Sequence, residues 1–179
     1  GGAEEFGAVR RDFADTAYWN AVVRTDVAGR ARVSVDLPDN LTTWRLSASG
    51  VTADTRVGQA QVDIISSKEL LVNPVVPRFF VVGDRAELAA VVHNNTTHSL
   101  DVEVELATGG LLIGGPTSQQ IAVPASSRVK VTWPVTAEDV PSANLRFATR
   151  STSSLASASG VTTHAPLALS DAIEVSIPI

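Results

Sequence analysis

Apolar and polar residues alternate with a period of two along most of this chain, and this pattern constrains the fold more than any other feature. In ARVSVDL (31–37), Val33 and Val35 fall on one face and Arg32 and Ser34 on the other. The same alternation recurs in DVEVELA (101–107), RVKVTWPV (128–135) and EVSIPI (174–179). Because successive side chains of a strand point to opposite faces, each segment predicts a strand with one apolar and one polar side.

Helical patterning is absent from the sequence. No segment of ten or more residues keeps apolar residues at three- and four-residue spacing between capping signals. We therefore predict an all-β protein of antiparallel β-sandwich domains, similar to immunoglobulin or fibronectin domains. The predicted strands are 18–27, 30–37, 44–51, 57–65, 68–76, 85–93, 99–107, 118–123, 127–135, 143–150, 155–163 and 171–178.

These strands predict one partial and one complete domain, with the boundary at the polar stretch SSKEL (66–70). Residues 67–179 hold enough strands for a whole sandwich of about 110 residues. Residues 13–66 supply one sheet but no second sheet to cover its apolar side. Residues 1–12 are predicted to form a flexible arm. We expect the partial domain to expose an apolar face or strand edge, through which the chain would self-associate.

Composition excludes several classes of function. Hydrophobic residues make up 44%, which suffices for a packed core. The net charge of -5 and the lack of a basic stripe argue against nucleic acid as a partner. No apolar run reaches the 18 residues of a membrane helix. The absence of cysteine excludes disulfides and thiolate chemistry. Because methionine is also absent, even at position 1, we expect an internal fragment.

Two sets of residues resemble metal ligands but are better explained as surface and turn residues. Asp12, Asp15 and Asp26 do not have the spacing of a calcium loop, so a solvated segment is favoured. His93 and His98 flank the turn NNTT with no third ligand nearby, which favours a hairpin turn with polar neighbours.

Candidate catalytic residues have similarly simple explanations. Glu103 and Glu105 would lie on one strand face, like the carboxylate pair of a glycosidase, but they occupy the polar positions of an amphipathic strand. The serine-rich segment 151–160 contains no Gly-x-Ser-x-Gly motif. Gly109-Gly110 and Gly114-Gly115 do not open a lysine-containing phosphate loop. We predict no catalytic, cofactor-binding or metal-binding residue, and hence a non-catalytic module.

Four stretches together resemble the α2-macroglobulin superfamily, and most closely its bacterial members. FADTAYW (13–19) resembles the family segment that follows the bait region. The sequence LPDNLTTWR, within DLPDNLTTWRLSA (36–48), resembles the family's Pro-Asp-x-(Ile/Leu)-Thr-x-Trp signature. PRFFVVGD, which opens the stretch 77–94, resembles the start of the next macroglobulin-like domain, and DAIEVSIPI (171–179) completes the match.

The resemblance implies a place for each part of the chain. Residues 13–66 would be the C-terminal portion of a macroglobulin-like domain that the bait insertion interrupts. Residues 67–179 would be the complete macroglobulin-like domain that follows, and residues 1–12 the possible end of the bait insertion. The implied function is a non-catalytic scaffold of a broad-spectrum protease inhibitor, linking the bait region to the thioester-bearing region. Without cysteine this chain cannot itself hold the thioester.

The implied partners are the neighbouring macroglobulin-like domains, the thioester region and, through the full-length protein, proteases. The implied location is the cell envelope, as a periplasmic protein or membrane-anchored lipoprotein, or the extracellular medium. One alternative is a carbohydrate-binding or adhesin-type sandwich that stacks sugars on Trp19 or Trp44, with Trp133 in the core. Another is an enzyme that uses Glu103 and Glu105, which the motif search disfavours.

Overall fold

Strands are the only regular secondary structure in the computed structural model, which describes residues 9–152 and 169–179. This confirms the all-β prediction for the described residues, while the predicted strand 155–163 lies outside them. In those same residues there is no helix with the length and apolar character that a membrane span requires. The chain forms two compact units, one from Asp12–Ser67 and the other from Lys68–Ile179 together with the segment that ends at Arg11.

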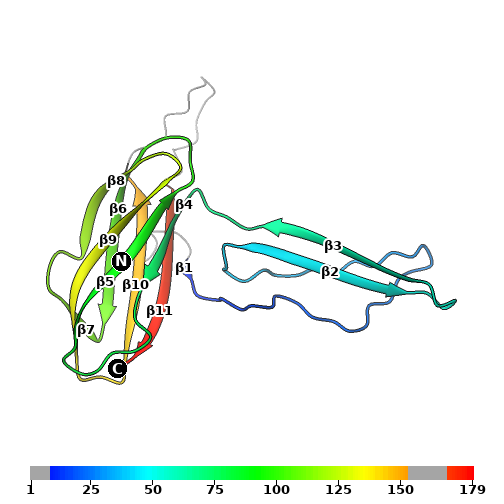
Figure 1. Ribbon diagram of the computed structural model, residues 1–179, viewed down its shortest axis with the longest axis horizontal. Helices are drawn as coiled ribbons and strands as arrows, with labels where there is room; N and C mark the ends of the chain where they lie inside the picture. The colour runs from blue at the N-terminus through cyan, green and yellow to red at the C-terminus, as the bar shows by residue number, and fades with distance from the viewer. Residues whose placement is uncertain (1–8, 153–168) are drawn as a thin grey trace. The chain divides into compact units, whose positions relative to one another are not determined.

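The larger unit is a sandwich of two sheets (Figure 1). One sheet has the strand order β1-β11-β10-β6-β8, formed by Val9–Arg10, Ser170–Pro178, Ser142–Ser151, Leu100–Gly109 and Ser118–Val123. The other has the order β4-β5-β9-β7, formed by Leu70–Val75, Arg85–Asn94, Ser127–Ala137 and Leu111–Ile113. All neighbouring strands run antiparallel except β1, which lies parallel to β11.

The core of the sandwich lies between the inner faces of the two sheets. The alternation in β6 buries Val102, Val104 and Leu106 and leaves the residues between them at the outer face. Trp133 of β9 and Phe147 of β10 meet edge to face across the core, with ring centroids 5.9 Å apart. Aromatic pairs in this geometry contribute beyond the area that they bury, so this contact joins the two sheets at their centre.

The smaller unit contains one hairpin, β2 (Thr43–Val51) and β3 (Val57–Ile65). Trp44 pairs with Ile64 and Leu46 with Val62, so these side chains share one face. Leu46, Val62 and Ile64 are all exposed. Because the described residues supply no second sheet in this unit, the hairpin presents an uncovered apolar face.

The predicted strands 18–27 and 30–37 are wrong. Both segments are described without strand structure, and Val22, Val23, Val27 and Val33 are exposed. The chain does reverse between them, because the Asp26 carboxylate accepts hydrogen bonds from the amides of Ala28 and Arg30. Alternation specifies a strand only when a neighbouring backbone completes the ladder, and here no such partner is present among the described residues.

Two short strands were not predicted. β7 has only three residues and follows Gly110, whose φ is +91° and where a Cβ would lie 2.8 Å from Cγ2 of Val140. Val9 and Arg10 form β1, although the sequence predicted a flexible arm for residues 1–12. Two residues are too few to show alternation, and this strand depends on a partner far along the chain.

Replacing Phe147 by alanine should destabilise the sandwich by about 3–5 kcal/mol, because it leaves a cavity against Trp133. Phe79→Ala is the matched control, since the Phe79 side chain is 66% exposed, and it should change stability by less than about 0.5 kcal/mol. Urea unfolding followed by circular dichroism measures both. Equal shifts of the unfolding midpoint would contradict this placement of the core.

Candidate functional site

The Asp171 carboxylate forms the most highly connected buried ionic site among the residues that the structure describes. It is fully buried and accepts four hydrogen bonds. Arg10 donates from Nε to Oδ1 at 3.0 Å and from Nη2 to Oδ2 at 2.7 Å. Lys68 Nζ donates to Oδ1 at 2.7 Å, and the Val72 amide donates to Oδ2 at 3.0 Å. We call these four residues the Asp171 junction.

Strand geometry places these groups together. Asp171 has the same parity in β11 as Ile173 and Ile177, so its side chain points to the inner side of the sheet. Arg10 also points inward, and its Nη2 donates to the carbonyl oxygen of Val72 in β4 at 2.8 Å. The bidentate contact and the carbonyl fix the guanidinium in one orientation.

The charges of the junction do not cancel, since two cations share one carboxylate. Arg10 is 6% exposed, whereas the side chain of Lys68 is 33% exposed, so the excess charge can be hydrated at Lys68. A buried ion pair is not by itself a strong source of stability, because desolvation offsets the attraction. Losing one partner is costly, however, because it leaves a buried charge without compensation.

The Asp171 junction brings together the residue near which the chain leaves the sandwich, Arg10, and the residue at which it returns, Lys68. Arg10 lies just before residues 12–67, and Lys68 lies just after them. Asp171, about a hundred residues further on, binds both. The junction therefore holds together the two ends of the sandwich chain that flank residues 12–67.

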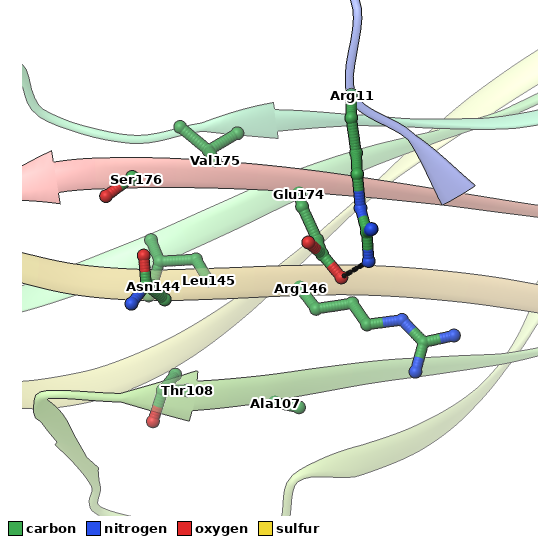
Figure 2. Close-up of a pocket in the computed structure, with 9 residues that line it drawn as sticks. All are labelled: Arg11, Ala107, Thr108, Asn144, Leu145, Arg146, Glu174, Val175 and Ser176. Atoms are coloured by element: carbon green, nitrogen blue, oxygen red, sulfur yellow. Dashed lines mark hydrogen bonds and ion pairs between the residues drawn. The ribbon is translucent and has the colours of Figure 1, made fainter. Parts of the chain in front are cut away.

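A shallow hollow of about 460 Å³ lies on the outer face of the five-stranded sheet (Figure 2). Arg11 extends across it to Glu174, with Nη2 and Oε1 2.8 Å apart. The guanidinium of Arg146 points away from that pair. The remaining lining residues are Ala107, Thr108, Asn144, Leu145, Val175 and Ser176. The carboxylate in this lining, that of Glu174, is paired with Arg11.

Glu103 belongs to a structural ion pair. Its carboxylate accepts a hydrogen bond from Ser118 Oγ at 2.8 Å and binds Arg150 Nε at 2.7 Å. The hydrogen bond from Ser118 and the bonds and charge of Arg150 lower the pKa of Glu103. Glu105 occupies the next outward position of β6, opposite Ser118. A carboxyl group with a lowered pKa is poorly suited to act as a general acid.

His93 and His98 flank a polar turn that is held by side-chain hydrogen bonds. The buried Asn94 side chain donates to the carbonyl oxygens of His98, Val123 and Pro124 and accepts from Thr96. Burial, and secondarily the charge of Arg128, lowers the pKa of His93. Within residues 9–152 and 169–179, no three acidic, histidine or cysteine side chains are grouped to hold a metal.

The aspartates of the smaller unit also have local roles. The Asp12 amide donates to Asp39 Oδ2 at 3.0 Å, and the Asp39 amide donates back to the Asp12 carbonyl at 2.7 Å. Asp26 shapes the turn already described, and Asp15 is exposed.

Of the serine-rich segment, Ser151 lies in β10 and residues 153–160 lie outside the described residues.

The tryptophans differ in environment. Trp133 is buried, as predicted. Trp19 is 82% exposed, and Trp44 is half-buried.

Sequence reasoning missed the Asp171 junction. One signal was available, because Asp171 falls on the same alternating face as Ile173, Val175 and Ile177. A carboxylate in register with an apolar face must be paired if that face is buried. The partners Arg10 and Lys68 had no comparable signal, because they approach Asp171 only in the folded sandwich.

The larger unit is thus a two-sheet antiparallel β-sandwich with a buried ionic junction. The model of the alpha-2-macroglobulin family matches residues 16–106, and the chain belongs to this family. The predicted resemblance and the macroglobulin-like fold are thereby confirmed.

Among the curated relatives, an alpha-2-macroglobulin homolog of Nostoc sp. is 35% identical over 146 residues, covering 79% of this chain and 8% of its own length. An alpha-2-macroglobulin of Thermotoga maritima is 34% identical over 131 residues, covering 72% and 8%. The chain thus spans under a tenth of either relative.

Solved structures share the fold. Trypsin-activated alpha-2-macroglobulin from Escherichia coli matches with a TM-score of 0.67 at 18% identity, covering 94% of this chain and 12% of that one. A Salmonella alpha-2-macroglobulin mutant matches with a TM-score of 0.62 at 19% identity, covering 86% and 9%.

Asp171→Asn should destabilise the sandwich by about 3–5 kcal/mol, because the buried Arg10 loses its counter-charge. Glu174→Gln removes the neighbouring exposed carboxylate from Arg11 and should cost less than about 1 kcal/mol. Chemical unfolding of both variants gives the comparison. If the two costs were the same, the Asp171 junction would not be the buried network described above.

Glu103→Gln should lower the free energy of unfolding by about 0.5–1 kcal/mol at neutral pH. Because the pKa of Glu103 is lowered on folding, its contribution is present above the pKa of the unfolded state and lost as pH falls through the lower folded value. The difference from the unmodified chain should therefore shrink on acidification. Urea titrations over a pH series test this, with exposed Glu87→Gln as control. A difference that is constant with pH would refute it.

Proposed function

We propose that this chain is a non-catalytic scaffold module of a bacterial alpha-2-macroglobulin-like protease inhibitor. The membership of the family supports this proposal. In it, residues 13–66 are the C-terminal portion of an interrupted macroglobulin-like domain, and residues 67–179 are the complete domain that follows. The module links the bait region with the thioester-bearing region, and residues 1–12 would be the end of the bait insertion.

The single observation that carries the scaffold role is the incomplete smaller unit. Its hairpin exposes Leu46, Val62 and Ile64 on one face. An apolar face of this kind is covered in a stable domain by a second sheet. We infer that another part of a longer protein supplies this sheet.

The proposed partners follow from the same reading. They are the neighbouring macroglobulin-like domains, the thioester region and, through the full-length protein, proteases. The proposed location of the longer protein is the cell envelope, as a periplasmic protein or membrane-anchored lipoprotein, or the extracellular medium.

Inhibition of a protease by the longer protein tests the function. The longer protein should slow the digestion of a protein substrate by trypsin, and the isolated chain should not. Phe147→Ala in the longer protein should weaken inhibition, because it disrupts the scaffold, whereas Phe79→Ala should leave inhibition unchanged. Inhibition by the isolated chain, or none by the longer protein, would overturn the proposal.

Carbohydrate binding is the alternative that the exposed Trp19 favours, because sugars stack on exposed aromatic rings. A glycan array decides between the two functions. Strong binding that Trp19→Ala abolishes would favour the alternative, and an array without binding would favour the scaffold.

Leu46→Asp should reduce self-association of the isolated chain, because it places a charge on the exposed apolar face of the hairpin. Sedimentation velocity over a concentration series measures this. Ser47→Asp, on the opposite face of β2, is the matched control. Association that both variants weaken equally would place the contact elsewhere.

A further inference from the structure

Three consecutive side chains of the N-terminal segment each have a separate binding place at the edge of β11. Val9 packs on the paired Ala148 and Ala172. Arg10 binds the buried carboxylate of Asp171. Arg11 binds Glu174 at the surface. The three places suit, in order, an apolar side chain, a buried guanidinium and an exposed cation.

Backbone pairing between this segment and the sheet is short. Val9 is the register partner of Ala172 and Arg10 that of Ile173. The rest of β11 is held by a nine-residue register with β10. Segments with few ladder hydrogen bonds and little buried apolar area open at lower free energy than the core strands. β1 is therefore the strand of this sheet best suited to local release.

Release of β1 does not leave the buried carboxylate of Asp171 without partners. With Arg10 withdrawn, Asp171 still accepts bonds from Lys68 Nζ and from the Val72 amide. The Val72 carbonyl and the edge of β11 become open to water or to another donor. Arg10 itself would be hydrated on leaving. After release, Asp171 is still paired with Lys68. The site then offers the Val72 carbonyl oxygen, the edge of β11 and the Ala148–Ala172 pair to an incoming segment.

The site selects arginine over lysine at its buried position. The guanidinium spans both carboxylate oxygens of Asp171 and also reaches the Val72 carbonyl. A lysine ammonium is a point donor and cannot reproduce that fork.

We propose that the β11 edge, with Asp171 and Glu174, is an exchangeable strand-docking site for an extended Val-Arg-Arg segment. Val9–Arg11 occupies it within one chain, and the same segment from a second copy of the chain occupies it when the first is released. This inference goes beyond the proposed scaffold function and does not depend on it.

Peptide binding to a chain with a loosened β1 tests the proposal. The probe is fluorescein-labelled AVRRDF, residues 8–13, and its matched control has glutamine in place of the first arginine. The host is the full chain carrying Arg10→Gln, Val9→Cys and Ala172→Cys. Because the natural chain has no cysteine, oxidation can join only these register partners and lock β1 in place.

Anisotropy should show saturable binding of AVRRDF to the reduced host and loss of binding on oxidation. The glutamine peptide should bind at least about tenfold more weakly. No binding to the reduced host, binding that survives oxidation, or equal binding of the two peptides would each overturn the proposal.

Hydrogen exchange in the unmodified chain provides a test that no substitution can disturb. The backbone amides of β1 should exchange at least about tenfold faster than those of central β10. If β1 amides were as protected as the amide of Phe147, reversible release of β1 would be excluded.

Discussion

Attachment of the N-terminal segment to the sandwich depends on the carboxylate of Asp171. It is fully buried, and it binds one cation from before residues 12–67 and another from after them. Such a carboxylate is tolerated in a core only with partners, and these partners come from distant parts of the chain. The Asp171 junction therefore determines where β1 and β4 begin relative to β11.

Two other ion pairs of the sandwich each join one cation to one carboxylate. Glu103 with Arg150 and Glu174 with Arg11 lie on the outer face of the five-stranded sheet. They are partly or largely exposed. Glu103 and Arg150 pair across the neighbouring strands β6 and β10, and Arg11 pairs with Glu174 of β11 from just after β1, so both pairs add only modestly to the register that the core already fixes. Asn94 instead acts inside, where its amide closes the turn after β5. Each of these residues supports the architecture of the sandwich.

Much of the larger unit could be predicted from the sequence because its strands alternate strictly. Its segment β8 was predicted with the observed bounds, and β9 and β10 to within two residues at each end. In the smaller unit, β3 was also predicted with the observed bounds. The same rule failed for 30–37, where Val33 and Val35 alternate equally well with polar residues but the segment forms no strand, and Val33 is exposed. Alternation reports which residues can share a face, and it contains no information about whether a neighbouring strand is present.

The candidate site shows the limit of sequence reasoning more clearly. The structure places Glu103 and Glu105 in β6 and His93 and His98 on either side of a turn, where the local pattern had predicted them. Arg10 was assigned to a flexible arm. In the structure it is buried and binds Asp171, which lies 161 residues further along the sequence.

The sequence by itself determined the all-β class and the family, since alternation and local motifs are properties of short segments. Only the tertiary structure decided which charges are buried together, because the Asp171 junction exists only after two sheets have packed face to face.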